Sequence, residues 1–111
     1  MEINTKTVEQ VTVVQLTGEL DGSTAPTAQE QILPLIQEGG RILLDMTGVA
    51  YMSSAGLRML LLLYRQTRSH NGRIALVGLS EEIQDTMSVT GFLDFFTTHE
   101  TLDSGLEALN R

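Results

Sequence analysis

The chain contains no cysteine among its 111 residues. Disulfide bonds, thiol catalysis and thiolate metal sites are therefore excluded. A sequence without cysteine also suits the reducing conditions of the cytoplasm, where we expect this protein to act.

Basic residues and long apolar runs are also scarce. Seven lysines and arginines stand against 14 aspartates and glutamates, which gives a formal net charge of −7. Such a chain is repelled by phosphate backbones and anionic lipid surfaces, so we expect no nucleic acid as a partner. The longest apolar run, MLLLLY at 59–64, is far shorter than the roughly 20 residues that span a bilayer. The N-terminus lacks the features of a secretion signal, so we expect neither export nor membrane insertion.

Common signatures of enzymes are missing as well. The sequence has no G-x-S-x-G, no phosphate-binding Walker loop and no G-x-G-x-x-G. Its histidines, His70 and His99, lie far apart and lack the spacing of metal ligands. We therefore expect no catalytic residue, no metal site and no cofactor. An esterase-like serine is disfavoured because no base accompanies it.

Strands alternate with helices along the chain, after an opening hairpin. The expected strands cover 2–7, 11–17, 41–46 and 73–78, with a short edge strand within 92–98, and the expected helices cover 24–38, 54–70, 81–90 and 101–109. Pro34 predicts a kink in the first helix, and Ser80 is a candidate N-cap. This order predicts one α/β domain over residues 1–111, with a mixed, mostly parallel sheet of four to five strands and about four helices.

Polar loops are expected to meet at one edge of this sheet. Parallel strands bring their carboxyl ends together, and ligands and partners of open α/β sheets usually bind there. Asp21, Ser53, Ser54 and Ser80 are then candidate neighbours. Asp21 has two open interpretations, since it can cap the helix that follows or face a partner.

The stretch YMSSAGLR, residues 51–58, raises the central question about function. A serine before an apolar helical run is the usual N-cap, because its oxygen accepts a hydrogen bond from a free amide of the first turn. One cap needs only one hydroxyl, however, and Gly56 costs about 1 kcal/mol relative to alanine within a helix. A glycine there also lets another chain approach closely. The methionines at 46, 52, 59 and 87 are expected to fill the core, and Met52 is in addition a candidate partner contact.

Three stretches together resemble the STAS-domain anti-sigma-factor antagonists. They are GELDGSTAP at 18–26, RILLDMTGVAYMSSAGLRML at 41–60 and RIALVGLS at 73–80. The resemblance covers nearly the whole chain. It implies a small α/β domain that is reversibly phosphorylated on a serine at the start of the helix after the third strand, which is Ser54 here.

The resemblance also implies partners. The unphosphorylated form would bind an anti-sigma factor, often a serine kinase of the GHKL type, and so free a sigma factor. Phosphorylation would end this binding, and a PP2C-type phosphatase would restore it. The implied partner-binding residues are Asp21, Gly22, Ser23, Met52, Ser53, Ala55, Gly56 and Arg58.

One departure from the family's pattern leaves an alternative open. The family usually has an aspartate before the phosphorylated serine and often a hydroxyl residue after it, and Ser53 and Ala55 occupy these positions here. Ser53 is therefore an alternative phosphate acceptor. Because the motif is weaker here, a second function also stays open: the chain can be a STAS subunit with a structural role in a larger transporter or stress-sensing assembly.

Overall fold

The first two strands form a hairpin, as the sequence predicts. In the computed structural model, which describes residues 1–111, β1 (Glu2–Val8) pairs antiparallel with β2 (Val11–Leu20). The two residues between them, Glu9 and Gln10, have φ angles of 51° and 69°. Two such residues give a turn whose twist matches that of the flanking strands.

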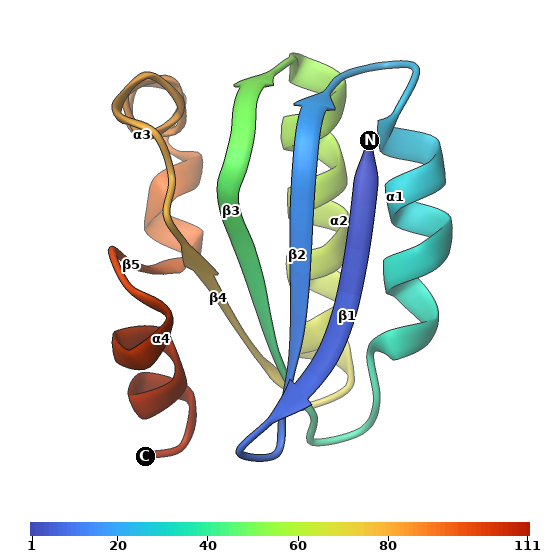
Figure 1. Cartoon of the computed structure of the whole chain (residues 1–111), viewed down its shortest axis with the longest axis vertical. Coiled ribbons are helices and arrows are strands. Elements are labelled where there is room, and N and C mark those ends of the chain that lie inside the picture. Colours follow the sequence, from blue (N-terminus) through green and yellow to red (C-terminus); the bar gives the residue numbers. More distant parts are fainter.

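The sheet has five strands in the order of the chain, β1-β2-β3-β4-β5. β3 (Arg41–Met52), β4 (Arg73–Val77) and β5 (Thr97–His99) each run parallel to the preceding strand. The prediction of a mixed, mostly parallel sheet is therefore confirmed, and Figure 1 shows β2 and β3 at its centre.

Helices cover both faces of this sheet. They are α1 (Ala25–Ile32), α2 (Ser54–Ser69), α3 (Glu81–Val89) and α4 (Leu102–Leu109), with 3₁₀ turns η1 (Leu33–Leu35) and η2 (Phe92–Phe95). Buried residues of α1, α2 and α3 join one core of 20 residues, whereas α4 closes a smaller core of seven on the opposite face. Figure 1 shows α2 behind β2, with α1 beside it. None of the helices combines the length and the apolar character needed to cross a lipid bilayer.

The central strands supply side chains to both cores because successive residues of a strand point to opposite faces. In β3, Leu43 belongs to the smaller core and Leu44 to the larger one, and both are fully buried. Met46, Met59 and Met87 are buried in the larger core, as the sequence predicts.

The first helix ends earlier than predicted. We expected it to continue to residue 38 with a kink at Pro34, but α1 stops at Ile32 and the chain continues as the 3₁₀ turn η1 before becoming extended at Ile36. The reason is the missing amide of Pro34, which cannot continue the hydrogen-bond ladder of an α-helix.

The second and third strands are longer than predicted. We assigned residues 18–20 and 47–52 to loops, but both segments are strand, and they pair with each other from Thr17–Gly48 to Leu20–Met52. Two register shifts, between Gln15 and Thr17 and between Gly18 and Glu19, interrupt the pairing. Such irregularities disturb the period-two pattern by which strands are detected in a sequence.

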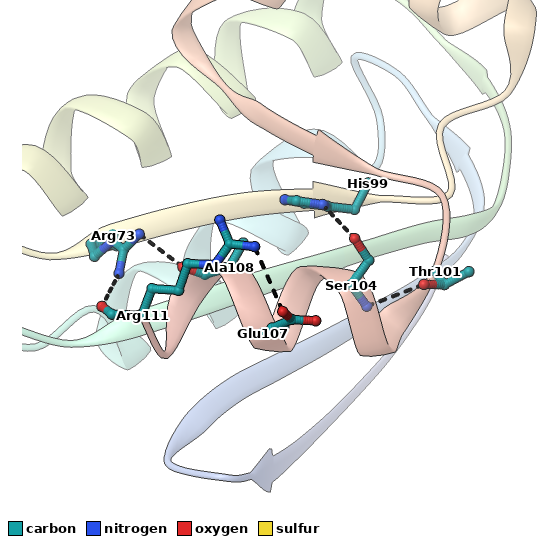
Figure 2. Close-up of polar contacts among 7 residues, drawn as sticks. All are labelled: Arg73, His99, Thr101, Ser104, Glu107, Ala108 and Arg111. Carbon is teal, nitrogen blue, oxygen red and sulfur yellow. Dashed lines mark hydrogen bonds and ion pairs between the residues drawn. The ribbon is translucent and has the colours of Figure 1, made fainter.

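The expected edge strand is present as β5, which begins at the end of the segment 92–98 and extends to His99, while residues 92–95 form η2. The closing helix α4 is held at its C-terminal end by Arg73 of β4. Its guanidinium donates hydrogen bonds to the carbonyl oxygens of Ala108, Leu109 and Arg111 over 2.9, 3.0 and 3.3 Å. Figure 2 shows those to Ala108 and Arg111. A cation at the end of a helix also complements the helix dipole.

Candidate functional site

The end of β2 and the start of α2 meet at the carboxyl edge of the sheet. The backbone amide of Ser53 donates to the carbonyl oxygen of Leu20 over 2.9 Å. This bond brings the loop that begins at Asp21 beside the two serines, as expected from the sequence for Asp21, Ser53 and Ser54.

Asp21 organises the turn that leads into α1. Its Oδ1 accepts hydrogen bonds from the hydroxyl and the amide of Ser23, at 2.8 and 2.9 Å, and from the amide of Thr24, at 3.1 Å. The Ser23 hydroxyl first, and then these amides, hold the pKa of Asp21 below its ordinary value. All of these partners precede α1, which begins at Ala25 and has no side-chain cap. Asp21 therefore shapes the turn and does not cap the helix, and its contact with a partner stays a prediction.

Thr24 closes this turn, a role that we did not predict from the sequence. Its hydroxyl accepts from the Asp21 amide at 2.9 Å and donates to the Glu19 carbonyl oxygen at 2.8 Å. The signal was present in the order Asp-Gly-Ser-Thr, which is typical of turns that hydrogen-bond their own backbone.

The two serines occupy different environments. Ser53 is the N-cap residue of α2 by backbone geometry, but its hydroxyl makes no capping hydrogen bond and is buried without any partner. Ser54 is the first residue of the helix and is exposed. The usual capping explanation therefore fails for Ser53, and the hydroxyl that reaches solvent belongs to Ser54.

Gly56 is required by packing inside the protein. It is buried, and a Cβ atom there would lie 2.8 Å from the carbonyl oxygen of Leu20 and 2.8 Å from Cγ of Met52. The absence of a side chain lets α2 approach the end of β2. This internal contact explains the glycine without the close approach of another chain that we inferred from the sequence.

The remaining predicted partner contacts lie around this junction. Gly22, Ser23 and Arg58 are exposed, and Met52 and Ala55 are half-buried. A groove of about 460 Å³ between α1 and α2 is lined by residues of both helices and of the Asp21 loop, namely Gly22, Ala25, Pro26, Gln29, Ala55, Arg58, Met59 and Leu62. Three of the predicted contacts, Gly22, Ala55 and Arg58, therefore share one groove, whereas Gly56 is buried.

Ser80 has a different task from the serines of α2. Its hydroxyl accepts from the Ile83 amide at 3.2 Å and so caps α3, whose first turn also holds Glu81 and Glu82. The N-cap predicted for Ser80 is confirmed.

The histidines have local partners of their own. His70 Nδ1 lies 2.8 Å from the carbonyl oxygen of Gln66, and His99 Nδ1 lies 2.9 Å from the hydroxyl of Ser104. Figure 2 shows His99 turned toward Ser104, whose amide donates a hydrogen bond to the hydroxyl of Thr101, the N-cap residue of α4. Neither histidine is hydrogen-bonded to Ser54. No group of three or more side chains that could hold a metal ion is present.

Sequence comparison places the chain in a family. The family model "STAS domain" matches residues 2–105, so this chain belongs to the STAS domain family. The anti-sigma-B factor antagonist of Bacillus subtilis is 25% identical over 107 residues, which cover 96% of this chain and 98% of that protein. The anti-sigma-B factor antagonist of Staphylococcus aureus is 29% identical over 101 residues, covering 90% and 94%.

Solved structures share the fold. A putative anti-sigma factor antagonist of Thermotoga maritima has a TM-score of 0.91 at 21% identity and covers 98% of this chain and 95% of its own. The Bacillus cell fate determinant SpoIIAA in its phosphorylated form has a TM-score of 0.73 at 19% identity, covering 96% and 98%. Part of the murine Slc26a9 anion transporter also matches, with a TM-score of 0.82 at 14% identity over 93% of this chain but 18% of the transporter.

Proposed function

We propose that this chain is an anti-sigma-factor antagonist, a binding module without catalytic activity whose binding is switched by phosphorylation of Ser54. In the unphosphorylated form it binds an anti-sigma factor that is also a serine kinase of the GHKL type, and it thereby releases a sigma factor. A PP2C-type phosphatase reverses the modification. The relatives named as anti-sigma-B factor antagonists support this role.

The observation that carries the proposal is the contrast between the two serines. A kinase must reach the hydroxyl that it phosphorylates, and Ser54 is exposed whereas the Ser53 hydroxyl is buried. In the reaction, Ser54 Oγ bonds to the γ-phosphorus of ATP, the bond from that phosphorus to the oxygen bridging to the β-phosphate breaks, ADP leaves, and a base of the kinase takes the hydroxyl proton. That a protein of the same fold has been solved in a phosphorylated form is consistent with this chemistry.

The phosphate is expected to weaken the complex with the partner and not the fold of the domain. It adds about 1.5 to 2 negative charges at pH 7, at a helix start where the free amides and the helix dipole favour negative charge, so the domain itself stays folded. A partner surface that covers the Ser54 hydroxyl would have to bury this charge, at a cost of several kcal/mol. Each 1.4 kcal/mol is a tenfold loss of affinity, so the modification is enough to end a micromolar complex.

The partner-binding surface of the proposal is the Asp21 loop together with the first turn of α2. It uses Asp21, Gly22, Ser23, Met52, Ser53, Ala55 and Arg58, with Gly56 supporting it from below. The groove between α1 and α2 is the concave part of this surface.

Phosphorylation of matched serine variants tests the proposal. The tagged protein is used to capture its cognate kinase from a lysate of the organism that encodes this chain. Each variant is then incubated with this kinase and ATP, and the phosphorylated residue is identified by mass spectrometry. Wild type and Ser53→Ala should both be phosphorylated at residue 54, and Ser54→Ala should stay unmodified. Phosphorylation of Ser54→Ala to the wild-type extent would refute the assignment. Loss of phosphorylation in Ser53→Ala would instead identify Ser53 as the acceptor.

The second candidate function is a structural subunit of a larger assembly, and the match to part of an anion transporter is the observation that favours it. Proteins that copurify with the chain distinguish the two. An anti-sigma factor or kinase supports the switch, whereas transporter or scaffold subunits support the structural role.

A further inference from the structure

Arg58 is the only lysine or arginine in the segments that gather at the carboxyl edge of the parallel strands. These segments, residues 17–26, 46–58, 77–85 and 97–104, otherwise contain only acidic charges apart from His99. The other basic residues lie in β1, at the starts of β3 and β4, in the second half of α2 and at the C-terminus, and they are Lys6, Arg41, Arg73, Arg65, Arg68 and Arg111.

The guanidinium of Arg58 has no partner within the protein. The side chain is exposed and takes part in none of the hydrogen bonds, and the single ion pair of the chain joins Arg111 to Glu107 at 3.6 Å. An arginine on an acidic surface is thus left free in the unphosphorylated protein.

Arg58 is placed to reach a group on Ser54. The two residues are four apart in α2 and share one face of the helix. Helical side chains point back toward the N-terminus, so Arg58 extends over the turn that begins with Ser54. An anion four residues before a cation is also the favourable orientation of such a pair, and the planar guanidinium matches the oxygens of a phosphate.

A phosphate on Ser54 would need such a counter-ion, because Asp21 lies on the adjoining loop. The Leu20–Ser53 hydrogen bond holds this loop beside α2, and Gly22 and Arg58 line the same groove. The Asp21 carboxylate is stabilised in its charged form by its hydrogen bonds. The dianion would therefore be added next to a negative charge, with Arg58 as the only cation within the same helical turn.

We infer that Arg58 is the internal counter-ion of phosphorylated Ser54. On phosphorylation, its guanidinium turns onto the phosphate and is withdrawn from the groove between α1 and α2. This inference rests on the phosphorylation proposed for Ser54 and adds a second effect to it. The modification removes a free cation, which in the unphosphorylated form is available to an acidic group of the partner. Arg58 is a positioning residue and takes no part in phosphoryl transfer.

The ionisation of the phosphate tests this role without any kinase. Phosphoserine is inserted at position 54 during translation by a suppressor tRNA, and the second pKa of the phosphate is followed by ³¹P NMR at low salt. Relative to wild type, Arg58→Gln should raise this pKa by about 0.2–0.5 units, the size expected for an exposed i,i+4 ion pair. Arg58→Lys should raise this pKa by less than Arg58→Gln does, because lysine keeps the positive charge but lacks the planar guanidinium.

Arg65→Gln is the matched control, since Arg65 is an exposed arginine of the same helix two turns further from Ser54. It should leave the phosphate pKa at the wild-type value, and about 1 M salt should weaken the effect of Arg58. A phosphate that titrates alike in wild type and Arg58→Gln would overturn the inference, as would an equal shift in Arg65→Gln. Because the phosphoserine is installed directly, these outcomes are independent of the kinase assay, which tests the phosphorylation itself.

Discussion

At the scale of single residues, neighbours in the sequence can have opposite roles. Ser53 and Ser54 are chemically identical, yet one hydroxyl is buried without a partner and the other is exposed. Gly56, two residues further, is explained by its contact with Leu20. The need for a glycine at position 56 does not follow from residue type, because it depends on the end of β2, which lies more than 30 residues earlier in the chain.

Asp21 gives the protein a pH-dependent component of stability. Its folded pKa is lowered, so its contribution is fully present above the unfolded value of about 3.9 and is lost as the pH falls through the folded pKa. We expect Asp21→Asn to be less stable than wild type at neutral pH. The difference should shrink as the pH falls below about 4.

Urea unfolding of both proteins between neutral and acidic pH measures this difference. A difference in the free energy of unfolding that stays constant over the whole range would contradict the role given to the Asp21 carboxylate.

At the scale of elements, the helices begin in different ways. α3 and α4 are each capped by a hydroxyl that accepts a hydrogen bond from an amide of the first turn. The hydroxyl belongs to Ser80 in α3 and to Thr101 in α4. α2 lacks such a bond at Ser53. The helix that carries the candidate phosphate acceptor is therefore held by packing against the sheet rather than by its cap, through Leu57, Leu60 and Leu63.

This contrast predicts different costs for two similar substitutions. Ser80→Ala removes a capping hydrogen bond and should lower the free energy of unfolding by about 1 kcal/mol. Ser53→Ala removes a buried hydroxyl without a partner and should cost less than about 0.5 kcal/mol, or even stabilise the protein, because an unpaired polar group is unfavourable in the interior. Thermal and urea unfolding of both variants measure the two values, and an equal loss for both would show that Ser53 does cap α2 in solution.

At the scale of the whole molecule, two cores share one sheet. The larger core lies under α1, α2 and α3, and the smaller one under α4. β3 connects them, since its alternate side chains enter opposite cores. We therefore expect the domain to unfold as one unit, although α4 packs on its own face.

Two adjacent leucines of β3 test this cooperativity. Leu43→Ala and Leu44→Ala each leave a cavity, in the smaller and the larger core respectively, and each should cost about 2–5 kcal/mol. Both variants should unfold in one transition with the urea dependence of wild type. A separate early transition for Leu43→Ala, seen by amide hydrogen exchange in α4 alone, would show that the smaller core unfolds independently.

The order of strands and helices and the mixed sheet followed from the sequence alone. These features depend on local patterns: the period of apolar residues, the position of Ser80 before two glutamates, and the glycines that end helices. The family motif added Ser54 as the acceptor, which stays a prediction.

Three features became known from the folded chain: which of the two serines is exposed, why Gly56 has no side chain, and how far β2 and β3 extend. Each depends on the contact between Leu20 and the start of α2, or on pairing across irregular strand segments, and neither leaves a periodic signal in the sequence. Burial and hydrogen bonding between distant segments are properties of the folded chain, and they give the hydroxyls of Ser53 and Ser54 different access to solvent.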